Sequence, residues 1–120
     1  MTNKINRKKI IGHTGEVLAK NFLIKKGYEI LFTNYRTKIG EIDIIALENN
    51  ELVFIEVKTR TNKNFLASEA ITYKKQKTIA NVGEIFLEET SPKYDNIIKR
   101  FDLLLIDEWN ISLIKNAFFV

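Results

Sequence analysis

GEIDIIA at residues 40–46 and LVFIEVKTR at residues 52–60 are the two stretches that decide the fold. Both are rich in β-branched and aromatic residues, and they predict strands over residues 41–47 and 51–59. Only residues 48–50 separate the two predicted strands. A connection this short predicts an antiparallel hairpin.

The turn of this hairpin determines which residues face each other across it. Asn49-Asn50 suits a two-residue type I′ turn, because Asn tolerates positive φ. Counting back from that turn sets Asp43 directly opposite Glu56. The same count sets Glu41 opposite Lys58. Side chains alternate along a strand, so Glu56 and Lys58 share one face of the sheet.

Two opposed carboxylates predict a cation site. Directly opposed residues hold their Cβ atoms about 4.5–5.5 Å apart, so Asp43 and Glu56 repel unless a proton or a cation lies between them. Mg²⁺ or Mn²⁺ suits such a site, because these ions take oxygen ligands. Lys58 can then orient or deprotonate an attacking water, or neutralise phosphate charge, as phosphodiester hydrolysis requires. The alternative is a set of ordinary cross-strand ion pairs on a solvated sheet face.

The rest of the chain alternates between helical and strand patterns. A helix that connects two strands tends to return the second strand parallel to the first, so we expect an α/β fold with a mixed sheet. The expected elements are a helix over 6–26, a strand over 28–35, the two hairpin strands, a helix that begins between 66 and 72 and ends near 89, a loop over 91–96, and strands over 100–107 and 111–114.

Apolar spacing predicts which side of each helix packs on the sheet. Gly12 and Gly15 each cost about 1 kcal/mol relative to alanine inside a helix, which suggests either a close approach of another backbone to the first helix or a helix that begins later than residue 6. The predicted stripes are Ile11, Gly15, Leu18, Ala19, Phe22 and Leu23 in the first helix, and Ile71, Ile79, Val82 and Phe86 in the second.

Length and composition limit the class of protein. The 120 residues predict a single domain over 1–120, which is long enough to bury a real core. Cysteine is absent, which excludes disulfides and thiolate metal sites and favours a reducing compartment. No apolar run approaches the ~20 residues that cross a bilayer, and the first residues lack the apolar segment of a signal peptide. We therefore expect a soluble cytoplasmic protein that does not contact membranes.

Charge is distributed unevenly along the chain. Residues 1–40 carry nine Lys and Arg against two acids, an excess of +7, whereas residues 41–60 balance at −3 and residues 61–120 at zero. A basic first third beside an acidic centre is what a polyanion-binding protein with a metal site needs. A solvated basic helix is the alternative interpretation.

The chain also resembles a known family over nearly its whole length. The stretches that carry the resemblance are Gly12, Gly15-Glu16, Gly27-Tyr28, Asn34-Tyr35-Arg36, residues 40–46, residues 56–60, Glu69-Ala70-Ile71, Lys75-Gln76, Arg100-Phe101-Asp102 and Asn116-Ala117-Phe118. As a set they resemble the YraN-like family of small bacterial proteins, which is placed in the restriction-endonuclease-like, PD-(D/E)-x-K, nuclease superfamily. The resemblance implies that nuclease core and assigns Asp43, Glu56 and Lys58 to its motif. Asp43 follows Gly-Glu-Ile where many relatives have Pro-Asp.

Further residues are candidates for the same site. Lys75 interrupts the apolar stripe of the second helix, so it reaches toward the carboxylates or a phosphate, or extends to solvent. Glu16 is a candidate third metal ligand, since many nucleases of the superfamily place a helix glutamate near the metal. Asp102 is interpreted as structural, paired with Arg100 or Arg36. The candidate nucleic-acid contacts are Arg36, Lys38, Arg60 and Lys63 on flanking loops, with Gln76 added by resemblance alone; plain surface charge is the alternative.

Three functions compete on these residues. The first is a metal-dependent endonuclease that cuts DNA, including branched or structured DNA, with DNA expected before RNA. The second is a nucleic-acid-binding module that keeps the fold without catalysis, although such a module has no need of opposed carboxylates. The third is a subunit that a second copy or another protein completes, with the apolar tail over residues 117–120 as its docking surface or as a cover for the sheet.

The basic excess in residues 1–40 predicts strongly salt-dependent binding of nucleic acid. Each neutralised phosphate releases counterions, so the logarithm of the affinity should fall linearly as the logarithm of the salt concentration rises. Fluorescence anisotropy of labelled DNA at several salt concentrations measures this slope. A flat dependence, or no binding at low salt, contradicts nucleic acid as the ligand.

Overall fold

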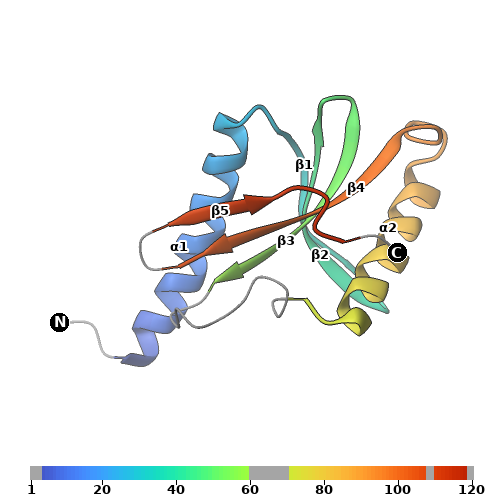
Figure 1. Cartoon of the computed structure of the whole chain (residues 1–120). Helices are drawn as coiled ribbons and strands as arrows, with labels where there is room; N and C mark the ends of the chain where they lie inside the picture. Colours follow the sequence, from blue (N-terminus) through green and yellow to red (C-terminus); the bar gives the residue numbers. More distant parts are fainter. Residues whose placement is uncertain (1–3, 60–70, 108–109, 119–120) are drawn as a thin grey trace.

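The computed structural model describes residues 4–59, 71–107 and 110–118, with the side chains of the first helix described from Gly15 onward. The seven elements follow the predicted order (Figure 1). They are α1 (Lys4–Lys25), β1 (Glu29–Thr37), β2 (Gly40–Glu48), β3 (Glu51–Thr59), α2 (Tyr73–Thr90), β4 (Ile98–Ile106) and β5 (Ile111–Ile114).

The five strands form one mixed sheet in the order β1-β2-β3-β4-β5. Neighbouring strands are antiparallel except β3 and β4, which run parallel from Glu51↔Ile98 to Thr59↔Ile106. The helix α2 connects this parallel pair, as a crossover must. The predicted α/β class and mixed sheet are confirmed, and the architecture is compatible with a restriction-endonuclease-like core.

The predicted hairpin turn is also confirmed. Asn49 and Asn50 adopt φ values of 57° and 62°, the left-handed pair that a type I′ turn requires. The turn sets Glu48 opposite Glu51, and the two strands pair from there. The register is the predicted one as far as Ile44↔Ile55, but Asp43 and Glu56, which were predicted to be directly opposite, lie beyond the last pair of this ladder.

The two helices pack on opposite faces of the sheet, so the fold has three layers (Figure 1). On one face, Ala19 and Leu23 of α1 are fully buried, but Leu18 is 43% exposed, so its place in the predicted stripe is wrong. The helix faces the sheet along a narrower stripe, with contacts four residues apart. Gly15 continues that stripe, and a Cβ there would lie 3.1 Å from Thr59 Oγ1. The close neighbour of Gly15 is therefore a side chain of β3 and not the expected backbone.

The other face carries the aromatic core under α2. The helix begins at Tyr73, where Thr72 is the N-cap and its hydroxyl accepts the Lys75 N–H. All four residues of the predicted stripe are buried. Ile79, Val82 and Phe86 lie on the helix, and Ile71 lies just before it. Within the described residues, neither helix is long and apolar enough to cross a membrane.

The end of the described chain covers the α2 face of the sheet. Phe118 is buried and stacks on Phe101 with ring centroids 4.9 Å apart. The Ala117 N–H donates to the Phe101 carbonyl at 2.8 Å. Of the two alternatives for this tail, packing on the sheet is the observed one for Ala117 and Phe118; Phe119 and Val120 lie outside the described residues.

A buried arginine holds the turn end of the sheet together. Arg100 is 4% exposed, and its Nε and Nη2 donate to Asp102, whose side chain is fully buried, at 2.9 and 3.0 Å. Its guanidinium also pairs with Glu48 at 2.8 Å and Glu51 at 3.4 Å, across the hairpin. The Tyr28 hydroxyl accepts from Arg100 and donates to Asp102, each at 2.9 Å. The pairing of Asp102 with Arg100 is confirmed.

The buried charges of this cluster shift the pKa values of Glu48 and Tyr28. Burial works in the opposite direction, yet hydrogen bonds from Arg100 and Lys115 hold the pKa of Glu48 below its ordinary value. Burial and the neighbouring Asp102 carboxylate raise the pKa of Tyr28, so its hydroxyl keeps its proton. One guanidinium thus fixes the hairpin, the end of α1 and β4 relative to one another.

Breaking this cluster is expected to destabilise the fold strongly. Asp102→Asn keeps the shape but removes the charge that compensates Arg100, and such changes cost about 3–5 kcal/mol of unfolding free energy. Urea denaturation measures it, with Glu84→Gln as the control. Glu84 pairs with Lys99 at 2.7 Å on the surface, where loss of a pair costs less than about 1 kcal/mol. Equal losses in the two variants would contradict the role given to Arg100.

Candidate active site

The candidate site lies where β2 and β3 separate. Pairing between them runs from Glu48↔Glu51 to Ile44↔Ile55, and β3 then continues beside β4 as far as Thr59. We call this point of separation the fork. It lies at the carboxyl end of a strand in an α/β sheet, the end at which such sheets commonly bind ligands.

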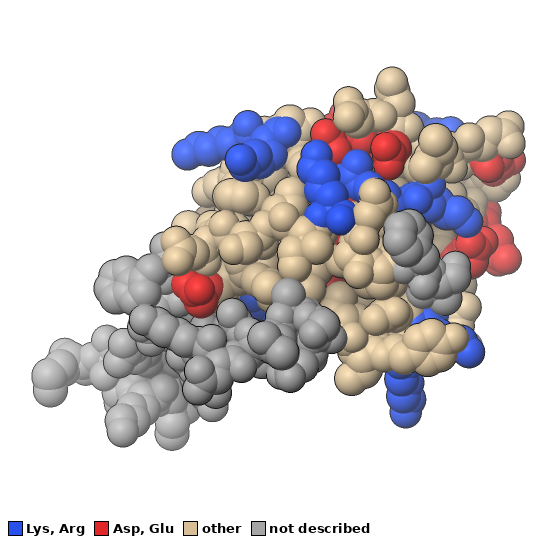
Figure 2. Space-filling model, in the orientation of Figure 1, with Lys and Arg blue, Asp and Glu red and all other residues tan. Residues whose placement is uncertain are grey.

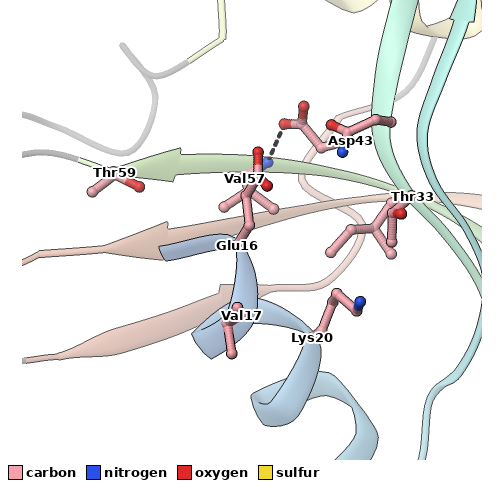
Figure 3. A pocket seen from close by; sticks show the side chains of 9 residues that line it. Glu16, Val17, Lys20, Thr33, Asp43, Val57 and Thr59 are labelled. Atoms are coloured by element: carbon pink, nitrogen blue, oxygen red, sulfur yellow. Dashed lines mark hydrogen bonds between the residues drawn. The ribbon is translucent and has the colours of Figure 1, made fainter. Parts of the chain in front are cut away.

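Asp43 occupies the fork. Its Oδ2 accepts the Val57 N–H at 2.8 Å (Figure 3). The side chain thereby satisfies a backbone donor of β3 beyond the point where the described ladder with β2 ends. The interaction fixes Asp43 against the strand that carries Glu56.

A local reversal in β2 aims Asp43 at the fork. Residues two apart on a regular strand share a face, yet Ile42 packs in the core under α2 and Ile44 in the core under α1. On β1, the pairs flanking this point are Thr33↔Ile44 and Tyr35↔Ile42, and Asn34 between them adopts φ 53°. The alternation of side chains along β2 is therefore interrupted at Asp43, and the residues before and after it face opposite sides of the sheet.

The face of Glu56 and Lys58 follows from regular alternation along β3. Phe54 packs under α2, whereas Val53, Ile55 and Val57 face α1. Glu56 and Lys58 therefore lie on the α2 side.

The start of α2 meets Glu56 there. Lys75, in the first turn of the helix, places its Nζ 3.8 Å from Glu56 Oε1. The Glu56 side chain is only 12% exposed, and that of Lys75 is 44% exposed. Lys75 thus points toward the carboxylate of Glu56, which was one of the two predictions made for it; the other was that it extends to solvent.

The carboxyl groups of Asp43 and Glu56 are hydrogen-bonded to each other, and both titrate abnormally. Burial, with repulsion from Asp43 next, raises the pKa of Glu56 to about 7, although Lys75 and Lys58 oppose the shift. Burial also raises the pKa of Asp43, although the Val57 N–H favours its charged form. Each of the two groups therefore keeps its proton to a higher pH than a free carboxyl group does.

Glu41 does not lie where the hairpin count placed it. It pairs with Arg36 on β1, where the Arg36 Nε lies 3.0 Å from Glu41 Oε2, and not with Lys58. The reversal at Asp43 explains the difference, because it takes the start of β2 away from β3. Within the described residues, Lys58 forms no ion pair. Its position beside Glu56 leaves its ammonium available to a ligand.

Glu16 borders the same site from α1. It lines a pocket between α1 and the sheet together with Asp43 and Val57, as Figure 3 shows. The close approach at Gly15 places this part of the helix against the end of β3. The structure thus brings Glu16 to the pocket that Asp43 borders.

The predicted nucleic-acid contacts have varied surroundings. Arg36 is 76% exposed on its side chain, and it borders a shallow surface hollow with Lys38. Gln76 donates its side-chain amide to the Ile71 carbonyl at 3.3 Å. Arg60 and Lys63 lie outside the described residues. On the face drawn in Figure 2, basic side chains stand in separate groups with acidic ones between them.

The donor set fits a hard divalent cation. Within the described part of the chain, no group of three or more His, Cys, Asp or Glu residues is positioned to hold a metal ion. Asp43 and Glu56 provide carboxylate oxygens, and a cation bound between them would favour the charged forms that burial disfavours. Two carboxylates suit Mg²⁺ in particular, which commonly keeps several waters.

Sequence reasoning missed the reversal of β2 and the pocket beside α1. Asn34 was the available signal for the first, since asparagine is one of the few residues that readily adopt positive φ. The second depends on the distance between α1 and the sheet, which no local pattern contains.

Comparison with known proteins places the chain in a family. The model of the Uncharacterised protein family UPF0102 matches residues 15–106, a span that includes the fork, Lys58 and Lys75. A UPF0102 protein of Caldicellulosiruptor bescii is 49% identical over 117 residues, covering 92% of this chain and 98% of its own length. One from Francisella tularensis is 46% identical over 110 residues, covering 90% and 93%.

The raised pKa of Glu56 predicts a pH-dependent loss of stability without metal. Its pKa rises from 4.5 to about 7, so the folded state binds an extra proton between those values. Stability should therefore fall as pH rises from 4.5 to 7 and stay low above it. In EDTA at pH 8, Glu56→Gln should be about 1–3 kcal/mol more stable than the wild type, with a flatter profile.

Urea denaturation between pH 4.5 and 8 provides the measurement for this profile. Glu88→Gln, which removes an exposed carboxylate of α2, should keep the wild-type profile. Parallel profiles for the wild type and Glu56→Gln would show that the fork carries no unneutralised charge.

Proposed function

This chain belongs to the UPF0102 family, and we propose that it is a metal-dependent nuclease that hydrolyses phosphodiester bonds of DNA. The observation that carries the proposal is the fork. Two largely buried carboxyl groups share a hydrogen bond there, and one half-exposed lysine offsets them incompletely. Maintaining such a pair lowers stability, which is reasonable where a ligand compensates it.

Asp43 and Glu56 would hold Mg²⁺ or Mn²⁺ through their carboxylate oxygens. Bound there, the ion would act as a Lewis acid on a phosphate oxygen and lower the pKa of a water. The Val57 N–H holds the Asp43 carboxylate in place, so the Asp43 side chain does not have to become ordered when the ion binds. Glu16 lines the same pocket as Asp43, but within the described residues no third carboxylate joins Asp43 and Glu56 in a group positioned to hold a metal ion.

The two lysines support the reaction from the α2 side. Hydrolysis adds water across a P–O bond, so the water loses a proton and the departing oxygen gains one. Lys58 lies on the face of Glu56 and without an ion pair within the described residues, so its ammonium can orient the water or stabilise charge developing on the phosphate. Lys75 favours the charged form of Glu56, against the effect of burial, and can contact a neighbouring phosphate.

DNA is the proposed substrate class, including branched or structured DNA. The excess of +7 in residues 1–40 supports a polyanionic ligand. A non-catalytic nucleic-acid-binding module is the competing function, and the same charges favour it. The buried carboxylates distinguish the two, because they repel phosphates and so weaken binding unless a cation compensates them.

Removal of the fork groups is expected to abolish cleavage. Asp43→Asn and Glu56→Gln each keep the shape and remove a ligand charge, and Lys58→Ala removes the ammonium. Each should reduce Mg²⁺-dependent cleavage on the order of 100-fold or more while DNA binding persists. Cleavage of single strands, flaps, four-way junctions and plain duplex should be followed with Mg²⁺ and with Mn²⁺.

Exposed groups outside the site provide matched controls: Glu88→Gln for the carboxylates and Lys93→Ala for the lysine. Both should cut like the wild type. A wild type that cuts none of these substrates, or fork variants that cut as well as it does, would replace the nuclease by the binding module.

A further inference from the structure

The pocket beside α1 has a volume of about 340 Å³ and adjoins the fork. It lies between α1 and strands β1 to β3, on the opposite side of the sheet from Lys75. Asp43 and Glu16 border it, so a group bound inside lies next to Asp43, one of the two proposed metal ligands (Figure 3). The proposed reaction uses the groups at this border and leaves the rest of the pocket unexplained.

Size limits what the pocket can hold. Pockets for small molecules measure about 300–1,000 Å³, so 340 Å³ accommodates one small ligand and excludes a paired duplex. Its opening is accessible, because Val17 and Lys20 of α1 and Thr33 and Asn34 of β1 are all exposed. A flexible strand could therefore insert a single unit from solvent.

Different residues of the lining suit the base and the phosphate of a nucleotide. Val17, Ile44 and Val57 offer apolar contacts from α1, β2 and β3. Asn34 offers both a donor and an acceptor for the edge of a base. Lys20 offers a positive charge for a backbone phosphate. Three of the nine lining residues are apolar and six are polar, so the pocket offers both packing surface and hydrogen-bonding groups.

We infer that this pocket receives one unpaired nucleotide of the substrate, so that the adjacent phosphate reaches the fork. The inference rests on the proposed function, because it uses the fork as the place of the scissile phosphate. Extruding a base from a duplex costs a few kcal/mol, and least where the base is already unpaired. The protein therefore selects DNA with unpaired nucleotides, such as bulges, mismatches and branch points, over plain duplex.

Binding in EDTA tests the pocket without cleavage. The probe is a short DNA duplex with a single bulged 2-aminopurine, compared with the same duplex in which 2-aminopurine is paired with thymine. Stacking on bases quenches 2-aminopurine, and the described pocket lining contains no aromatic side chain, so insertion should brighten the bulged probe. The wild type should bind that probe on the order of tenfold more tightly than the paired one.

Two variants close the pocket from different walls. Val17→Trp fills it from α1, and Thr33→Trp fills it from β1. Both side chains replaced are exposed, so circular dichroism should show an unchanged fold. Leu18→Trp is the matched control, since Leu18 is 43% exposed on the same helix and lies outside the lining. The control should keep both the preference and the brightening, and both pocket variants should lose them.

Failure of the pocket and failure of the nuclease give different results. If the wild type binds both probes equally, or if the pocket variants keep the preference, the inference is overturned whether or not the chain cuts DNA. If the preference depends on the pocket but no substrate is cut with Mg²⁺ or Mn²⁺, the nucleotide pocket stands and the nuclease does not.

Discussion

The hydrogen bond from the Val57 N–H to the Asp43 carboxylate is the interaction on which the site depends. It fixes Asp43 at the point where β2 leaves β3, and the reversal of β2 between Ile42 and Ile44 makes it geometrically possible. With Asp43 held there, its carboxyl group lies next to that of Glu56 on the neighbouring strand. The raised pKa of both groups is the consequence, and so is their suitability for a divalent cation.

Buried acidic groups at the two ends of β3 differ in how closely a cationic side chain pairs with them. At the turn end, Arg100 compensates the acids around it, and its short contacts contribute to holding the fold. At the fork, Lys75 is the nearest described cation to Glu56, half exposed and 3.8 Å away. The compensated end contributes to the stability of the fold, whereas a bound cation would complete the compensation at the other end, as we propose. We therefore interpret the first as the structural cluster and the second as the functional one.

Sequence patterns predicted the parts of the fold that depend on local chemistry. The asparagine turn, the strand hairpin and the crossover helix follow from propensity, spacing and connection length, and the turn at residues 49–50 predicted the hairpin register as far as Ile44↔Ile55. Errors arose where tertiary packing overrides local pattern. Leu18 fits a helical stripe but lies outside the narrow contact of α1, and Glu41 pairs with Arg36 because β2 turns over. The pocket beside α1 depends on layer spacing, which local patterns do not specify.

A crystal grown with Mn²⁺ tests the central claim most directly, because the anomalous signal locates the ion without any assumption about substrate. The account predicts an anomalous peak within coordination distance of both the Asp43 and the Glu56 carboxylates in the wild type, and no such peak in Asp43→Asn. Absence of a peak at the fork at saturating Mn²⁺, with the Asp43 and Glu56 carboxyl groups still hydrogen-bonded to each other, would contradict the metal site and the nuclease proposed from it.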